Sequence, residues 1–129
     1  MYLLNFSHPL TDQQRKEIEL LTQQSLERVM DIPVQLDNAL PYTEQICKLV
    51  RDIPLDAQQW QTEAILVNPP AYNYAALTLF AELHGKIGYF PSIIRIRPVE
   101  DSVPTRFEVC EIINLQVVRD AARETRKSI

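Results

Sequence analysis

The sequence predicts an α/β fold in which a mainly parallel sheet is flanked by helices and one antiparallel strand is added near the C-terminus. Short apolar runs typical of buried strands alternate with stretches of helical periodicity, and such alternation folds as a parallel sheet between helices. Near the end, two strand-like runs are joined by a loop too short for a parallel crossover. A length of 129 residues, without a linker or internal repeat, then fits a single domain over residues 1–129.

The chain is expected to begin with a strand and a helix. Residues 2–6 form a short apolar run that Pro9 ends. Thr11 and Gln14 have the spacing of a capping box, which marks the beginning of a helix. The apolar stripe of this helix comprises Ile18, Leu20 and Leu21.

A second strand and helix follow. Residues 26–36 are rich in β-branched and aliphatic side chains but contain Pro33. Because proline cannot donate a hydrogen bond to a central ladder, the strand is expected to end near Pro33 and to leave residues 34–37 at its mouth. From about Pro41 an amphipathic helix is expected, with apolar positions at Ile46, Leu49, Val50 and Ile53.

The third predicted strand and the helix after it are strongly apolar. Asp56 and Gln59 form a second capping box ahead of a short turn. Residues 64–67 are a continuous apolar run, typical of a strand covered on both faces. The helix predicted at 72–84 is apolar nearly all round, which leaves open a core helix or an oligomer interface, and Gly85 is its expected left-handed cap.

The last elements indicate a hairpin and a helix. Isoleucine and arginine alternate over residues 92–99, which predicts a strand with one wetter face near a sheet edge. Residues 106–113 follow after a short loop and are expected to pair antiparallel. Asn114 caps a helix over 115–127, whose dipole is complemented by Arg123, Arg126 and Lys127.

Composition excludes several function classes. A net charge of −4 argues against a general nucleic-acid coat or a duplex partner. Two glycines are too few for either the GxxxxGK[ST] or the GxGxxG phosphate motif. Cys47 and Cys110, isolated in apolar settings, are interpreted as buried packing residues in a reducing cytoplasm, and no run approaches the ~20 apolar residues of a membrane span.

Polar residues follow three of the predicted strands, where open α/β sheets bind their ligands and helix N-termini attract anions. Amides, a hydroxyl, an imidazole and tyrosine rings suit nucleobases and phosphates and suit metals poorly, so neither a metal nor a cofactor is predicted. The candidate ligand-binding residues are Asn5, Ser7, His8, Gln35, Asn68, Tyr72, Asn73 and Tyr74.

Other roles stay open for these residues. Asparagine after a strand is an ordinary turn residue, and Ser7 can act as a cap alone. Tyr72 and Tyr74 equally suit packing or a dimer contact. Arg95 and Arg97 suit either a phosphate or a solvated edge, and the third helix is expected to carry His84 to the opposite end, as a dipole partner or core residue.

Five segments together resemble a small family of CRISPR-associated Csx proteins encoded beside type III systems. They are NFSHPLT (5–11), DIPVQ (31–35), LVNPP (66–70), HGKIGYFP (84–91) and EIINLQ (111–116). The likeness covers nearly the whole chain in matching order and spacing. The resemblance implies a Rossmann-like fold akin to the CARF domain and to ring nucleases, with a cyclic oligoadenylate, most often the tetra-adenylate, as the ligand.

Three hypotheses follow for function. The first is a protein that binds the ring at a homodimer interface and dampens type III signalling by sequestration, with or without slow cleavage; higher assembly on ligand binding is left open. The second is an efficient metal-independent ring nuclease, in which His8 acts as acid or base and Ser7 donates a hydrogen bond to the phosphate. The absence of a loop lysine or arginine weakens that reading. The third is a generic nucleotide-binding or protein-interaction module.

Overall fold

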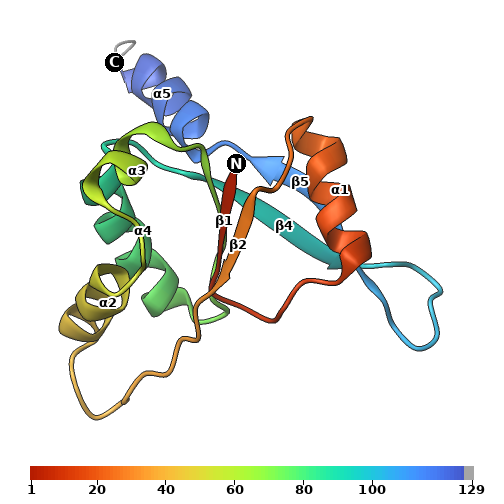
Figure 1. The fold of residues 1–129 in the computed structure, drawn as a ribbon, viewed down its shortest axis with the longest axis horizontal. Coiled ribbons are helices and arrows are strands. Elements are labelled where there is room, and N and C mark those ends of the chain that lie inside the picture. The colour runs from red at the N-terminus through yellow and green to blue at the C-terminus, as the bar shows by residue number, and fades with distance from the viewer. Residues whose placement is uncertain (127–129) are drawn as a thin grey trace.

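The fold is described for residues 1–126 in a computed structural model. In chain order its elements are β1 (Tyr2–Asn5), α1 (Asp12–Thr22), β2 (Arg28–Asp31), α2 (Tyr42–Arg51), α3 (Ala57–Thr62), β3 (Ile65–Asn68), α4 (Asn73–Ile87), β4 (Ser92–Pro98), β5 (Phe107–Ile113) and α5 (Leu115–Arg126) (Figure 1). This order follows the predicted one, with α3 as a six-residue helix where the sequence predicts a turn.

One sheet contains all the described strands, in the order β2-β1-β3-β4-β5. β1 lies in parallel between β2 and β3, and β3 pairs in parallel with β4. β4 and β5 form an antiparallel pair. The predicted fold class is therefore confirmed as a mainly parallel, Rossmann-like sheet with one antiparallel strand at its end.

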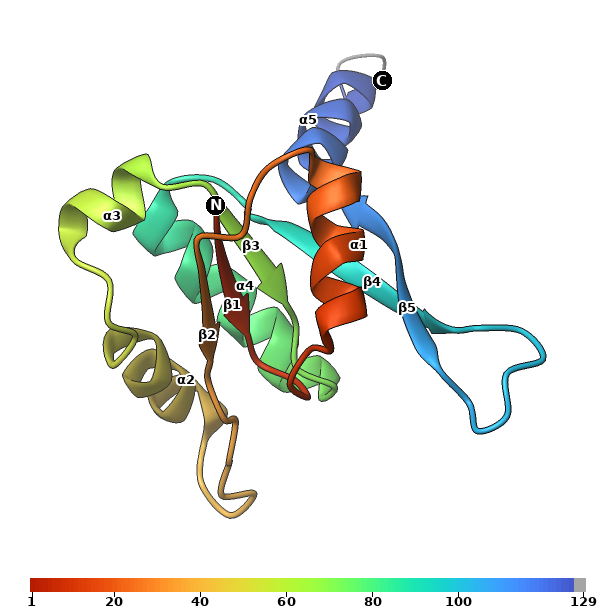
Figure 2. The ribbon, with the colours of Figure 1, turned by 45° about the vertical axis from the view of Figure 1, so that its right-hand side comes forward.

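Helices cover the sheet on both faces (Figure 2). On one face, α2, α3 and α4 pack over Leu4 and Val67, whereas on the other Ile18 of α1 packs over Leu3 and Leu66. Adjacent strand residues point to opposite faces, so each strand contributes to both cores. All four positions of β3 are buried, as its continuous apolar run predicts.

Helix beginnings follow the sequence signals closely. The hydroxyl of Thr11 accepts from the Gln14 N–H at 3.1 Å, and the Gln14 side chain accepts from the Thr11 N–H at 2.9 Å. Asp56 and Gln59 make the same reciprocal pair at α3. Asn114 Oδ1 accepts an N–H from the first turn of α5 at 3.1 Å. Both capping boxes and the cap of the last helix are therefore confirmed.

The end of α4 differs from the prediction. Gly85 lies inside the helix, and the left-handed cap is Gly88, with φ 92° and its N–H bonded to the His84 carbonyl at 2.8 Å. The additional turn buries Ile87, which is 4% exposed. Core packing of that side chain offsets the ~1 kcal/mol cost of a glycine within a helix, so the cap forms at the second glycine.

The second strand also ends earlier than expected. β2 stops at Asp31, two residues before Pro33, and the chain continues as a loop to α2. Gln45 of α2 holds this loop, since its side chain accepts from the Asp37 N–H at 2.8 Å and donates to the Asp37 carbonyl at 3.0 Å. The loop is thus tied to the helix that follows it.

Two expectations about apolar residues are wrong. Leu20 and Leu21 do not join Ile18 in the core, because they are 78% and 47% exposed. Leu20 is two positions from Ile18, about 200° around the helix, and so faces away from the sheet. Cys47 and Cys110 are half-buried rather than buried, and Cys110 belongs to β5, which has a neighbouring strand on one side alone.

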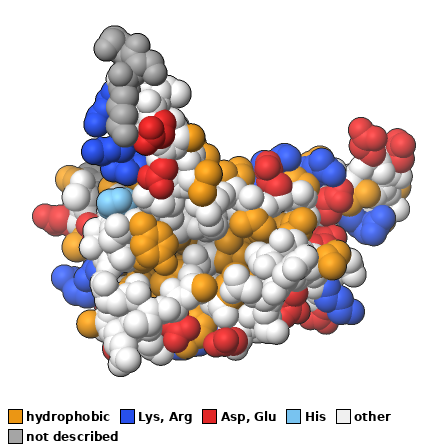
Figure 3. Space-filling view, turned by 90° about the horizontal axis from the view of Figure 1, so that it is seen from above, with side chains coloured by type: hydrophobic (Ala, Val, Ile, Leu, Met, Phe, Trp, Pro, Cys, Tyr) orange, Lys and Arg blue, Asp and Glu red, His pale blue; other side chains and the backbone are white. Residues whose placement is uncertain are grey.

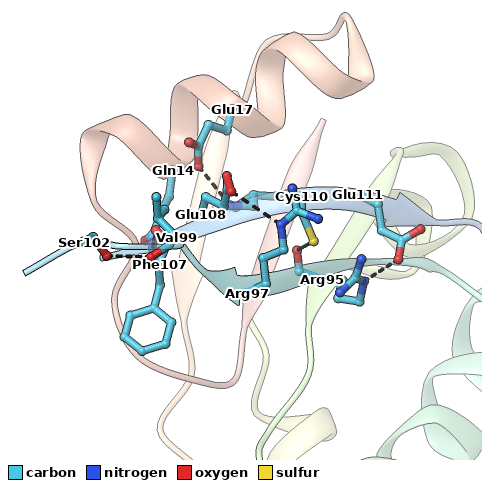
Figure 4. Close-up of polar contacts among 11 residues, drawn as sticks. Gln14, Glu17, Arg95, Arg97, Val99, Ser102, Phe107, Glu108, Cys110 and Glu111 are labelled. Carbon is cyan, nitrogen blue, oxygen red and sulfur yellow. Dashed lines mark hydrogen bonds and ion pairs between the residues drawn. The ribbon is translucent and has the colours of Figure 1, made fainter. Parts of the chain in front are cut away.

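The outer edge of β5 is protected by α1 (Figure 4). Gln14 Nε2 donates to the Phe107 carbonyl at 3.0 Å, and Glu17 accepts the Val109 N–H at 2.9 Å. Unpaired backbone groups on an edge strand invite pairing with another chain, so these two side chains remove a hazard.

α5 projects from the rest of the molecule in both views (Figures 1 and 2). Its last described turn contains Arg123 and Arg126, as the sequence predicts, whereas Lys127 lies outside the described residues. Within residues 1–126, no helix has both the length and the apolar character needed to cross a bilayer.

Candidate functional site

Three polar side chains form a row where β2, β1 and β3 end. The register pairs Asn5 with Asp31 on one side and with Asn68 on the other. Asn5 is 0% exposed and Asn68 is 6% exposed, whereas Asp31 is exposed. The carboxyl ends of the three strands therefore meet at one edge through polar groups, where the topology predicts a ligand site.

Asn5 is the centre of this row. Its Oδ1 accepts from the Ser7 N–H at 3.1 Å and from Asn68 Nδ2 at 2.9 Å. Its Nδ2 donates to the His8 carbonyl at 2.9 Å and to Asp31 Oδ1 at 2.8 Å. An asparagine amide has two donors and two acceptor positions, and all four are used here. Reversing the amide would place donors against donors, so its orientation is determined.

This network holds the turn after β1. The N–H of Phe6 donates to the Asn68 carbonyl at 2.9 Å, and that of Ile32 donates to the Asn5 carbonyl at 2.8 Å. With the side-chain bonds of Asn5, these contacts attach the Ser7–His8 backbone to the neighbouring strands. Asn5 and Asn68 therefore position the turn, and no buried polar side-chain atom among residues 1–126 lacks a partner.

A pocket of about 300 Å³ adjoins the Ser7–His8 turn that this network holds. Loops after all three strands line it. β1 contributes Phe6, Ser7 and His8, β2 is followed by Pro33 and Val34, and β3 is followed by Pro70, Ala71 and Tyr72. Ser7, His8 and Tyr72 supply the polar side chains of the pocket, and all three are exposed.

The adjoining helices differ in how they begin. The first turn of α1 is occupied by its capping box. α4, which is 15 residues long, begins after Tyr72 without a side-chain cap. Asn73 Oδ1 accepts one N–H of the first turn, from Tyr74 at 2.9 Å, so the positive end of the α4 dipole next to the pocket is partly open to an anion, whereas that of α1 is closed by its capping box.

The eight candidate residues divide into three groups. Ser7, His8 and Tyr72 line the pocket, whereas Asn5 and Asn68 are buried and hold the turn that contributes Ser7 and His8 to it. The others are outside the lining: Gln35 is exposed in the loop after β2, Asn73 Oδ1 accepts from the Tyr74 N–H, and Tyr74 is 71% exposed on α4.

Asp31 is a member of the row that the sequence reasoning does not select. With the second strand expected to end near Pro33, the sequence predicts residues 34–37 at the strand end instead. A strand that ends at Asp31 would align it with Asn5 and Asn68, and the DIPVQ segment already contains it. Its carboxylate accepts from Asn5 Nδ2 at 2.8 Å and so orients the Asn5 amide, but Asp31 is not among the residues that line the pocket.

Positive charge is scarce in this pocket. Among the described residues that line it, none is lysine or arginine. Arg95 forms an ion pair with Glu111, and Arg97 pairs with Glu108 at 3.4 Å (Figure 4). Both arginines therefore belong to the solvated face of the β4–β5 hairpin. The hydrogen bond with Glu111 raises the pKa of Arg95, which stays charged.

Metal-ligating side chains do not gather in the part of the chain that the structure describes. No group of three His, Cys, Asp or Glu residues has a geometry that could hold an ion within residues 1–126. His84 lies near the end of α4, where its ring is 4.4 Å from that of Phe90. His8 is thus the imidazole at the candidate site.

Comparisons with family models, with curated proteins and with solved structures give no match to this chain.

Proposed function

We propose that this protein binds a cyclic oligoadenylate, with the tetra-adenylate as ligand, and dampens type III CRISPR signalling in the cytoplasm by sequestering it. The observation that carries the proposal is the pocket formed by three strand-end loops, which Ser7, His8 and Tyr72 line and where α4 begins directly after Tyr72. Such a site suits a nucleotide. The choice of this messenger among nucleotides rests on the resemblance to the Csx family.

The two sides of the pocket differ in what they offer an anion. The beginning of α4 is favourable, whereas Pro33 and Val34, which follow β2, have no side-chain donor. A phosphate is therefore expected beside residues 70–72, with hydrogen bonds from Ser7 or His8. An adenine then stacks on Tyr72, whose ring is 63% exposed.

Pocket size favours two copies for one ring. A volume of about 300 Å³ is at the lower end of the ~300–1,000 Å³ of small-molecule sites. One pocket therefore accommodates part of a cyclic tetranucleotide. Because that ring has two-fold symmetry, an isologous homodimer can present one pocket to each half.

Cleavage is the second candidate function, and His8 favours it. In a ring nuclease, the ribose 2′-hydroxyl gives its proton to a base and attacks the adjacent phosphorus. The bond from phosphorus to the 5′-oxygen breaks, the leaving oxygen takes a proton, and a 2′,3′-cyclic phosphate results. His8 is placed to exchange these protons, but the pocket lining has no cationic side chain for the developing charge.

One experiment separates the readings. The purified protein is incubated with radiolabelled cyclic tetra-adenylate and EDTA, and native gels are compared with product chromatography. Retarded, intact ligand supports sequestration. Linear products support the nuclease, in which case His8→Ala should slow turnover by about 10²-fold. If neither binding nor cleavage is observed, the remaining hypothesis is a generic nucleotide-binding or protein-interaction module.

A pair of tyrosine variants tests the pocket itself. Tyr72→Ala removes the proposed stacking surface and should weaken binding by about 5- to 150-fold. Tyr89→Ala is the matched control, because Tyr89 is 40% exposed just after the opposite end of α4. Equal affinities for the two variants would contradict this placement of the ligand.

A further inference from the structure

α5 is a helix without a complete packing partner. None of its residues from Leu115 to Arg126 is buried. Its apolar side chains recur at helical spacing at Leu115, Val118 and Ala122, and Val118 is 57% exposed. Isolated helices of about 12 residues are marginal in water and depend on packing of an amphipathic face. This helix therefore has more apolar surface than its own domain covers.

An apolar groove of about 430 Å³ lies between α4 and α5. Its floor is Ile93 of β4, and its walls are Leu77 and Phe80 of α4 and Leu115 and Val118 of α5. Leu77 is 72% exposed. Viewed from the side where α5 projects, apolar side chains spread across the middle of the molecule, with charged ones toward both sides (Figure 3).

We propose that this groove is the homodimer interface, in which the exposed face of α5 and Leu77 of one copy pack against the same groove of a second copy. The surface contains both an amphipathic helix that needs cover and an apolar groove that needs an occupant. A two-fold axis satisfies both at once, because each copy supplies what the other lacks. An apolar centre with a polar rim is the usual anatomy of such an interface.

Charge next to the groove favours a second copy over an acidic or basic partner. Arg95 lies on the same face of β4 as Ile93, two residues further along. It pairs with Glu111, and Arg119, the charged residue of the groove lining, pairs with Asp120 at 3.0 Å, so each of these positive groups has a negative partner beside it. A balanced rim can meet its own two-fold copy with opposite charges, whereas a single-sign rim would repel it.

The groove also adjoins the candidate site. Pro69 lines the groove, and the next residue, Pro70, lines the pocket. In this one respect the inference rests on the proposed function: a dimer formed here would place two pockets beside a shared interface, where one ring could contact both.

The test is sedimentation velocity of the full chain without ligand over a range of concentrations. The unmodified protein should be a dimer, and Leu77→Glu and Val118→Glu should each raise the dimer dissociation constant by about 30-fold or more. Leu20→Glu is the matched control, since Leu20 is 78% exposed on α1 and outside the groove. Circular dichroism checks that each variant is folded.

Three outcomes would overturn the inference: a monomer at every concentration, a Leu77→Glu dimer as tight as the unmodified one, or dissociation by Leu20→Glu to the same degree. Ligand binding, measured separately, distinguishes this failure from that of the proposed function. A monomer that retains cyclic tetra-adenylate refutes the interface alone. A dimer sensitive to Leu77→Glu that binds no ligand supports the interface and refutes the function.

Discussion

Two polar clusters in this protein differ chiefly in burial. The side chains of Asn5 and Asn68 are closed to water, and Asn5 uses every donor and acceptor of its amide, while Asp31 at one end of this network is exposed. The charge ladder of the β4–β5 hairpin, which consists of the ion pairs Arg95–Glu111 and Arg97–Glu108, is open to water. The side chains of the first pair are 48% and 47% exposed, and those of the second are 55% and 29% exposed. Neutral amides thus occupy the buried position and full charges occupy the surface.

This difference predicts which cluster determines the structure. Deleting a member of a buried network leaves its partners without hydrogen bonds, and each such group costs about 1–3 kcal/mol. Deleting a member of an exposed pair allows water to replace it, so typical pairs contribute below about 1 kcal/mol. The amide network should therefore hold the strand ends in place, whereas the ladder mainly adjusts the surface.

The largest effect is expected from placing a charge in the amide network. Asn68→Asp replaces a donor with a carboxylate facing Asn5 Oδ1 and should destabilise the fold by about 3–5 kcal/mol at pH 7. Burial raises the pKa of the introduced carboxyl, so stability should recover as pH falls and that group becomes a donor. Urea unfolding at pH 7 and pH 4.5 measures this, and an equal loss at both pH values would contradict it.

Removing the central amide should come next. Asn5→Ala leaves the Ser7 N–H and the His8 carbonyl without their partner and should cost about 2–4 kcal/mol. Asn38→Ala is the control, because Asn38 accepts from the Tyr42 hydroxyl at an exposed position; it should change stability by less than about 0.5 kcal/mol. Chemical denaturation would rank the two, and similar losses would refute the role assigned to burial.

An intermediate effect is expected at the edge of β5. Glu17→Ala removes the acceptor of the Val109 N–H and should lower the free energy of unfolding by about 1–2 kcal/mol. Glu17→Gln retains a side-chain oxygen and should lose about half as much. Thermal unfolding measures both. If light scattering shows no greater self-association of Glu17→Ala than of Glu17→Gln, protection of the edge is not the function of this contact.

The smallest effect is expected in the charge ladder. Arg97→Ala should cost less than about 1 kcal/mol at low salt. Added salt should reduce this difference, because screening acts on exposed pairs within a Debye length of about 10 Å at 0.1 M. Unfolding midpoints at two ionic strengths test it, and a large loss independent of salt would mean that the ladder resembles the buried network.

Sequence patterns predicted the elements better than their ends. The capping boxes at Thr11 and Asp56 could be identified because each depends on residues three apart, within one turn. The end of α4 could not, because Gly85 and Gly88 are equally good local caps. Burial of Ile87 decides between them, and that depends on packing of distant residues.

The candidate site was predicted in part for the same reason. Strand-end position alone selected Ser7, His8 and Tyr72, which do meet in one pocket. It did not separate them from Asn5 and Asn68, which are buried and hold the Ser7–His8 turn in place. Nor did it select Asp31, whose alignment with Asn5 depends on the register between two strands.

Local chemistry in the sequence therefore determined the alternation of strands and helices, the caps and the set of polar loop residues, since these depend on neighbours in the chain. Tertiary structure alone decided which of those residues are buried supports and which face the pocket. It also left the apolar faces of α4 and α5 beside each other without cover. Burial and register are properties of contacts between distant segments, and no local pattern contains them.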